Sequence, residues 1–293
     1  MRPKSRRVPG AHGLSLQLFE WSDAGPSLLF MHGFGHGARI WDPFVAPLAD
    51  HYRTLALDAR GHGDSDHDPE YRYSHAAVSR DLSEVVEVQG LDPVVLVAHS
   101  MGGYASIRYA ARYPKRVARL VLVDAGPELS TQSRAGRRVR RTRVDRSFAD
   151  TKAYQVVLAR LHPRADAAAL AHWAEHALRR LPDGRYEAKL DPAFLRPKSS
   201  SDPVNRRDFD RVAWARQEEE RLWRHLAEIP CPTLVIRGEH SDVLSARTQE
   251  RMVNEWLPDG RAVTIPGAGH VVMLDAPEAL RRELGAFLLD PPA

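Results

Sequence analysis

Short apolar runs recur in both ends of the chain and predict the strands of a buried sheet. Residues 14–20 alternate between apolar and polar side chains, which is the period of a half-buried strand. Residues 94–98 and 119–123 are instead apolar almost throughout, as expected of central parallel strands covered by helices on both faces. Shorter apolar runs predict further strands at residues 28–31, 54–57, 233–236 and 261–265.

Helical patterns separate these strands. Apolar residues three or four positions apart predict helices over residues 38–49, 74–89, 104–113, 245–256 and 277–289. Gly90 ends the second of these helices and Pro114 ends the third. Because strands that alternate with helices are typical of open parallel sheets, the sequence predicts an α/β fold.

The alternation stops between residues 128 and 228, where no buried strand is evident. Segments rich in Ala and Arg at 165–181 and 208–226 predict amphipathic helices, and the prolines and serines of 191–203 predict a loop between them. Since the alternation of strand and helix then resumes, we divide the chain into three parts. These are a first part of the core at 1–128, a helical insertion at 129–228 and a second part of the core at 229–293.

Composition narrows the class of protein. With 293 residues, 43% of them hydrophobic, the chain can bury a large core. Its apolar runs are far shorter than the roughly 18 residues that a membrane-spanning helix needs. The basic residues at the start are followed by Pro9 and Gly10, whereas a signal peptide would continue with an apolar segment. The single cysteine, Cys231, excludes an internal disulfide and fits a reducing compartment. We therefore expect a cytoplasmic protein with no membrane partner.

The strand at 94–98 leads directly to a serine. The residues Ala98-His99-Ser100-Met101-Gly102 join this strand to a helical pattern. A serine on so tight a turn has its hydroxyl exposed above the sheet and requires small residues two positions before and after it. Ala98 and Gly102 meet that requirement, although glycine is usual at the first position. We interpret the segment as a nucleophile elbow.

Four further motifs accompany the elbow: residues 29–35 (LFMHGFG), 58–65 (DARGHGDS), 237–242 (RGEHSD) and 267–270 (GAGH). With these five motifs in this order, nearly the whole chain resembles the α/β-hydrolase superfamily. Within it, the chain is most similar to the cap-bearing serine hydrolases, which include esterases, lactonases and carbon–carbon bond hydrolases. The resemblance implies a mostly parallel eight-stranded sheet flanked by helices, with residues 129–228 forming a helical cap over the active site.

The resemblance also implies a catalytic triad in the chain order serine, acid, histidine. A serine hydroxyl needs a base to accept its proton and an acid to orient that base. Ser100 is then the nucleophile, and His270, in a glycine-flanked loop after the last strand, is the base. Asp242 is the expected acid because its loop carries the fuller family pattern. Asp124, which follows the preceding strand, is the alternative.

In this fold the oxyanion of the reaction intermediate is bound by backbone N–H groups, which here would be those of Phe34 and Met101. Residues beside the active-site motifs are candidates for substrate binding: His99, Trp41 and Leu244. The remaining polar residues of the motifs are interpreted as braces of their loops rather than as bases: His32, Arg60 and His62.

Ester hydrolysis through an acyl-enzyme on Ser100 is the leading interpretation of function. The serine argues against dehalogenases and epoxide hydrolases, which carry an aspartate at the elbow. The sequence shows no cluster with metal-ligand spacing, and the glycines at 33, 35 and 37 do not match a nucleotide-binding loop, so we expect no metal and no cofactor. A lactonase or carbon–carbon hydrolase with the same triad remains open, as does a non-catalytic ligand receptor or carrier.

Charge adds one local feature. The chain has 42 basic and 38 acidic residues, mixed along most of its length, so we expect no nucleic-acid partner. Residues 134–146 are the exception, with seven arginines and a single acidic residue, Asp145. A solvated helix face is the first interpretation. The alternative is a surface that attracts an acidic substrate or an acidic acyl carrier, as in some esterases that resemble this chain.

Overall fold

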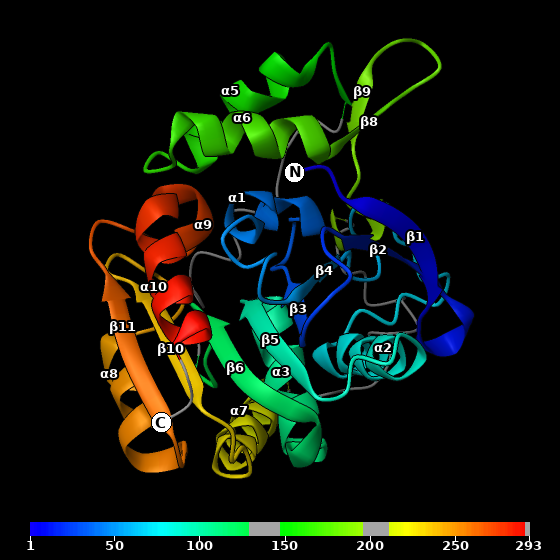
Figure 1. Cartoon of the computed structure of the whole chain (residues 1–293). Helices are drawn as coiled ribbons and strands as arrows, with labels where there is room; N and C mark the ends of the chain where they lie inside the picture. The colour runs from blue at the N-terminus through cyan, green and yellow to red at the C-terminus, as the bar shows by residue number, and fades with distance from the viewer. Residues whose placement is uncertain (129–146, 196–210, 291–293) are drawn as a thin grey trace.

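An eight-stranded sheet forms the centre of the molecule (Figure 1). The computed structural model describes residues 1–128, 147–195 and 211–290. The strand order is β1-β2-β4-β3-β5-β6-β10-β11. Only the pairs β1–β2 and β2–β4 are antiparallel, which confirms the predicted mostly parallel sheet. The strands are β1 (Lys4–Pro9), β2 (Ser15–Glu20), β3 (Ser27–Met31), β4 (Arg53–Leu57), β5 (Val94–His99), β6 (Val117–Val123), β10 (Thr233–Gly238) and β11 (Gly260–Ile265).

One hydrophobic cluster lies on each face of the sheet. Because successive side chains of a strand point to opposite faces, each strand contributes to both clusters. In β3, Leu29 and Met31 pack into one cluster while Leu28 and Phe30 pack into the other. The first cluster is covered mainly by α2 (His75–Val88), α3 (Met101–Arg112) and the segment that follows α8 (Ala246–Arg251). The second is covered by α1 (Asp42–Val45), α9 (Val272–Asp275) and α10 (Pro277–Leu289).

Strand β1 was not predicted. Its sequence, KSRRVP, has no apolar alternation because β1 is an edge strand with most of its side chains exposed. Backbone pairing with β2, from Lys4 opposite Glu20 to Pro9 opposite Ser15, holds it in place. Polar and charged side chains are common on such edges, where they discourage pairing with another chain.

The cap lies over the carboxyl ends of the parallel strands (Figure 1). It contains α5 (Thr151–Leu161), α6 (Ala167–His176) and a small antiparallel sheet of β7 (Ser147–Phe148), β9 (Tyr186–Ala188) and β8 (Leu178–Arg180). The expectation of an insertion without strands is therefore wrong. Strands of two or three residues are too short to produce a recognisable period in the sequence.

Helix α7 (Arg211–Ala227) belongs to the core and not to the insertion, where it was predicted. Leu222, Trp223 and Leu226 are buried in the same cluster as the residues of α3, on the side of the molecule opposite the cap (Figure 1). The described cap thus spans 147–195, and α7 packs as a helix of the core. An amphipathic pattern shows which face of a helix is buried but not which partner covers it.

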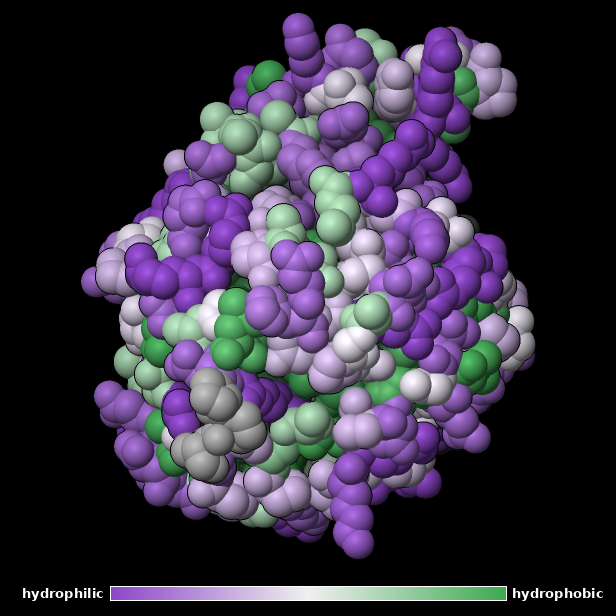
Figure 2. Space-filling model, viewed as in Figure 1, coloured by the Kyte–Doolittle hydropathy of each residue, from purple (hydrophilic) through white to green (hydrophobic). Residues whose placement is uncertain are grey.

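The outer surface is mostly hydrophilic on the face seen in Figure 2, with isolated hydrophobic patches. Within the described residues, no helix combines the length and the apolar character needed to cross a membrane. Cys231 is buried and carries a free thiol.

Candidate active site

Ser100 lies on the turn between β5 and α3, in the strand–serine–helix arrangement of a nucleophile elbow. Its φ of 49° and ψ of −113° are strained for a residue with a side chain. The small residue at 102 is needed because a Cβ there would lie 2.8 Å from the Met31 Cβ and 2.9 Å from the His32 carbonyl oxygen. The neighbour that requires a glycine at 102 is thus the end of β3.

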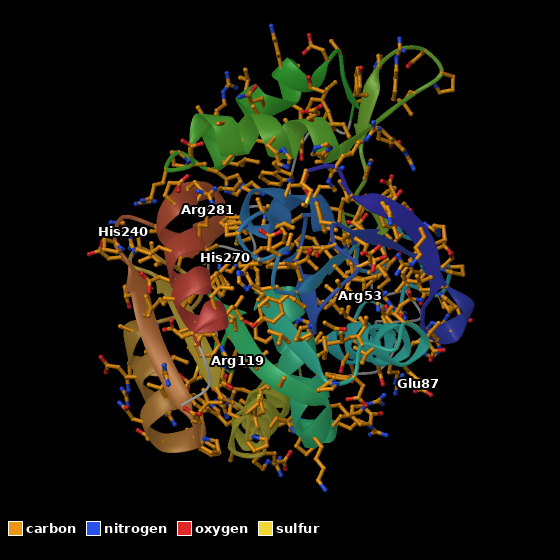
Figure 3. The ribbon with its side chains drawn as sticks, viewed as in Figure 1. Arg53, Glu87, Arg119, His240, His270 and Arg281 are labelled. Atoms are coloured by element: carbon orange, nitrogen blue, oxygen red, sulfur yellow. The ribbon has the colours of Figure 1, made fainter. Side chains whose placement is uncertain are left out.

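His270 reaches Ser100 from the loop between β11 and α9, and Figure 3 shows it beneath the cap. Its Nε2 lies 3.1 Å from the Ser100 Oγ. The loop is held by the Gly269 N–H, which donates to the Asp275 carboxylate at 2.7 Å. It also packs so closely on β10 that a Cβ at Gly238 would lie 2.1 Å from the Gly269 carbonyl oxygen. The imidazole is therefore held at hydrogen-bond distance from the serine.

The acid that contacts this histidine is Asp124, at the end of β6, and the prediction of Asp242 is wrong. The His270 Nδ1–H donates to the Asp124 Oδ2 at 2.7 Å. Asp124 is fully buried and accepts two further hydrogen bonds, from the Gly238 N–H at 3.1 Å and from the Ser241 hydroxyl at 2.5 Å. The loop that contains Asp242 thus supplies a hydroxyl that orients the acid instead of the acid itself.

Sheet topology explains this placement. β6 is hydrogen-bonded to β5, and the Ser100 N–H donates to the Val123 carbonyl at 3.1 Å, so the residue after Val123 lies beside the nucleophile. The tautomer follows from the contacts. A carboxylate only accepts hydrogen bonds, so Nδ1 carries the proton and Nε2 presents its lone pair to the Ser100 hydroxyl.

The predicted oxyanion donors border the serine. A Cβ at Gly33 would lie 3.1 Å from the Ser100 Cβ, so the loop after β3 passes directly against the nucleophile at the residue before Phe34. Met101 is the first residue of α3, where N–H groups have no acceptor within the helix and the helix dipole favours negative charge. The N–H groups of Phe34 and Met101 stay the predicted oxyanion donors.

His99 contacts the base rather than an open pocket. The ring is buried, and its Nε2–H donates to the His270 carbonyl at 3.0 Å. Burial, followed by the nearby His270, lowers the pKa of His99 well below its usual value. A neutral His99 therefore holds the backbone of the loop that carries His270.

Two predicted substrate-binding residues lie in the core instead. Trp41 is fully buried, with its ring centroid 5.1 Å from that of Phe30 and 5.9 Å from that of Phe44. Leu244 is also fully buried, against Gly126. The prediction that these residues bind substrate is wrong, because proximity to a motif along the chain does not determine which way a side chain packs.

Comparison with known proteins agrees with this geometry. Residues 26–277 match the family model described as the alpha/beta hydrolase fold. The chain belongs to the α/β hydrolase family.

Several relatives of this hydrolase are named for their reactions. The 2-(acetamidomethylene)succinate hydrolase of Mesorhizobium japonicum is 29% identical over 90% of this chain and 88% of its own. A crystal structure of E-2-(acetamidomethylene)succinate hydrolase superposes with a TM-score of 0.81 at 28% identity, covering 99% of this chain and 100% of that one. An esterase of Mycobacterium tuberculosis is 26% identical over 95% of this chain and 87% of its own. These relatives support hydrolase activity for this α/β hydrolase.

The polar residues of the motifs brace the loops of this hydrolase, as predicted. His32 bridges two loops: its Nδ1–H donates to the Gly33 carbonyl at 2.8 Å, and its Nε2 accepts from the Ala59 N–H at 2.9 Å. Burial lowers the pKa of His32 to about 4 and that of His62 to about 3, so both rings are neutral at pH 7. Among the described residues, neither imidazole has a hydrogen bond with Ser100, so neither is positioned to accept the proton of its hydroxyl.

Arg60 is buried among acidic partners. Its Nε and Nη2 donate to the Asp81 carboxylate at 2.6 and 2.7 Å, and its Nη1 donates to Asp68 at 2.9 Å. The side chains of all three residues are fully inaccessible to solvent. This ion-pair network joins the loop after β4 to α2 and so fixes the position of the loop beside the oxyanion donors.

Sequence reasoning missed two groups of residues. Phe34 is 45% exposed on the loop that passes against Ser100, and its ring makes an edge-to-face contact with Phe194 at 5.1 Å, so the two rings form an aromatic wall. Phe194 belongs to the segment that leaves the cap, and no motif marks it. Asp42, His172 and His176 form a cluster with metal-ligating side chains, contrary to the expectation that none exists. The spacing of the two histidines, four residues apart, is the signal that was overlooked. The arginines of 134–146 lie outside the described residues.

Proposed function

We propose that this hydrolase cleaves carboxylic esters through an acyl-enzyme formed on Ser100. The observation that supports the proposal is the continuous chain of contacts from the Asp124 carboxylate through His270 to the Ser100 hydroxyl, at 2.7 and 3.1 Å. A serine hydroxyl needs such a base in order to act as a nucleophile near neutral pH.

Each residue of the chain has a defined part in the mechanism. The Ser100 Oγ attacks the ester carbonyl while the His270 Nε2 accepts the hydroxyl proton. The Asp124 carboxylate stabilises the imidazolium that results, and the N–H groups of Phe34 and Met101 donate to the oxyanion. His270 then gives its proton to the leaving alcohol, which frees the alcohol and leaves the acyl group on Ser100. Water activated by His270 hydrolyses this acyl-enzyme and regenerates the serine.

The aromatic wall at the site favours a substrate with an apolar group. Phe34 lies in the predicted oxyanion loop, and Phe194 packs on both Phe34 and Tyr73, with ring centroids 5.1 and 4.2 Å apart. An acyl chain or ring placed against these faces would be removed from water at a gain of about 0.8 kcal/mol for each buried CH₂. We therefore propose a small or medium-sized organic ester as substrate.

Hydrolysis of a p-nitrophenyl ester series, from acetate to decanoate, tests the proposal. We expect turnover of at least one ester by the wild type, loss of essentially all activity in Ser100→Ala and His270→Ala, and retention in His240→Ala. His240 is a matched control because it is a half-exposed histidine in a neighbouring loop. A fluorophosphonate should label Ser100 in the wild type, as seen by peptide mass. Equal activity in Ser100→Ala would refute the mechanism.

Lactones and 2-(acetamidomethylene)succinate should be assayed in parallel. The same triad can open a lactone, and the second compound is the one named for the Mesorhizobium relative, whose likeness covers most of this chain. If the wild type hydrolyses a lactone or 2-(acetamidomethylene)succinate but no ester, and Ser100→Ala does not, then ester cleavage is wrong while the assignment of Ser100 as nucleophile is retained. Saturable binding without any turnover would favour a ligand receptor.

An acidic substrate or acyl carrier that binds at the arginines of 134–146 is a further proposal, based on their charge alone. Charge reversal at Arg137 and Arg141 should then weaken the catalytic efficiency with acidic esters, and added salt should do the same. Activity that responds to neither change would exclude this role.

A further inference from the structure

A second group of ligating side chains lies where the cap meets the core. His172 and His176 are one turn apart on α6, and Asp42 is the first residue of α1. The Asp42 Oδ2 lies 3.2 Å from the His172 Nε2 and 3.9 Å from the His176 Nε2. One ligand atom from each residue lies within 4.8 Å of the other two. These three side chains converge from two parts of the fold that the chain itself separates by 130 residues.

These separations match what a metal ion requires. Zinc binds imidazole nitrogen and carboxylate oxygen at about 2.0–2.2 Å, so two ligands of a tetrahedral ion lie roughly 3.3 Å apart. The pair at 3.2 Å already satisfies this, and the pair at 3.9 Å needs only a small side-chain rotation. The ligand atoms of the two histidines lie within 4.8 Å of each other, so the rings must also turn toward a common ion. Two histidines four residues apart on a helix are also a recurrent zinc-binding arrangement, because both rings project from one face.

The position of the group suits an exchangeable ion. The three side chains are 12–28% exposed, so an ion could reach them from solvent. Two imidazoles and one carboxylate form a ligand set that zinc and its neighbours in the transition series accept. We propose that Asp42, His172 and His176 bind one divalent transition-metal ion and that this ion ties the cap to the core.

Existing contacts of these residues limit the affinity. The Arg39 Nε donates to both Asp42 oxygens at 2.8 Å, and its Nη2 donates to Oδ2 at 2.5 Å. The His172 Nε2 donates to the Arg39 carbonyl at 2.9 Å. On metal binding, the Asp42 Oδ2 must exchange its hydrogen bonds from Arg39 for the ion, Oδ1 keeps the Arg39 Nε, and His172 releases the carbonyl. The nearby guanidinium repels the cation, so binding should be weaker than at a dedicated structural zinc site.

A bound ion would restrict the cap. In Figure 1, α6 crosses above α1 and α9, so metal–ligand bonds would join the helix that covers the site to the core beneath it. Substrates enter and products leave such sites when a covering segment moves. The ion should therefore slow turnover without any contact with Ser100.

Metal binding can be measured without any activity assay. The full chain, stripped with a chelator, is titrated with Zn²⁺ by calorimetry and with Co²⁺ by visible absorption. We expect one ion per chain, the absorption bands of tetrahedral Co²⁺ and a raised Tm. His176→Ala should abolish these signals because His176 supplies one of the three ligands. His225→Ala is the matched control, since His225 is also a helical histidine that pairs with a carboxylate, Glu228, three residues away.

The outcomes separate the possibilities. Absence of saturable binding, or binding that is unchanged in His176→Ala, would overturn the site. His172→Gln provides a second variant that loses a ligand while retaining a hydrogen-bonding side chain. If an ester substrate is found, Zn²⁺ should slow the wild type and His225→Ala but not His176→Ala. If Zn²⁺ inhibits the wild type, His225→Ala and His176→Ala equally, the inhibition arises from another group, and the proposal that the ion restricts the cap is wrong. Because binding is scored directly, failure of the ester proposal does not affect this test.

Discussion

Replacement of Asp124 by asparagine tests which acid serves His270. Asparagine has nearly the same shape as aspartate, and its oxygen can still accept from the Gly238 N–H, which donates to Asp124 at 3.1 Å. Its NH₂ group would then face the His270 Nδ1, which can accept, and the Ser241 hydroxyl, which already accepts from two backbone N–H groups and loses its own acceptor. The hydrogen bond to His270 is retained only if His270 adopts the tautomer with the proton on Nε2.

That tautomer cannot accept a proton from Ser100. The corresponding change in another serine hydrolase family lowers turnover about 10⁴-fold for the same reason. At 1.36 kcal/mol for each factor of ten, this is about 5.5 kcal/mol of lost transition-state stabilisation. The loss of stability should be much smaller, about 1–3 kcal/mol, since charged hydrogen bonds are replaced by neutral ones.

The assay is kcat/KM with the best p-nitrophenyl ester, together with thermal unfolding of each variant. We expect Asp124→Asn to lose about 10⁴-fold in kcat/KM while remaining folded. Asp242→Asn, the matched control, should stay within about threefold of the wild type, because Asp124 makes the contact to His270. The reverse pattern, or a loss below tenfold in Asp124→Asn, would refute the assignment of the acid.

Three further predictions follow from close or buried contacts. Gly33→Ala should lower kcat about 100-fold, because its Cβ would lie 2.4 Å from the His99 Nδ1; unchanged kcat would contradict this. Burial lowers the pKa of His32 to about 4, below its unfolded value of 6.5. Protonation of His32 therefore favours the unfolded chain, and the free energy of unfolding, measured with urea, should fall by up to about 3 kcal/mol as the pH drops from 7 to 4. An NMR titration that gives His32 a pKa near 6.5 would refute this cause. Arg60→Met should cost about 3–5 kcal/mol in the same urea assay, because the buried Asp81 carboxylate loses the guanidinium that pairs with it and Asp68 keeps only Arg72; a loss below 1 kcal/mol would contradict it.

Local patterns determined much of this protein. The apolar runs of the central strands predicted the sheet because a strand covered on both faces must be apolar throughout. The elbow around Ser100 could be recognised since a tight strand-to-helix turn requires particular small residues at particular spacings. In both cases, the constraint acts between residues that are close in sequence. His270 was instead placed by the resemblance to α/β hydrolases, which implies a base in the loop after the last strand.

Tertiary structure decided the rest. Asp124 lies beside Ser100 because β6 pairs with β5, and both Asp124 and Asp242 follow strands whose carboxyl ends meet at this edge of the sheet. The sequence offered two acids in equivalent positions, and only the order of the strands separates them. Likewise, α7 packs on the core and Trp41 turns inward because of partners distant in sequence. Patterns along the chain specify which face of an element is buried, whereas the identity of its partner depends on how the whole chain packs.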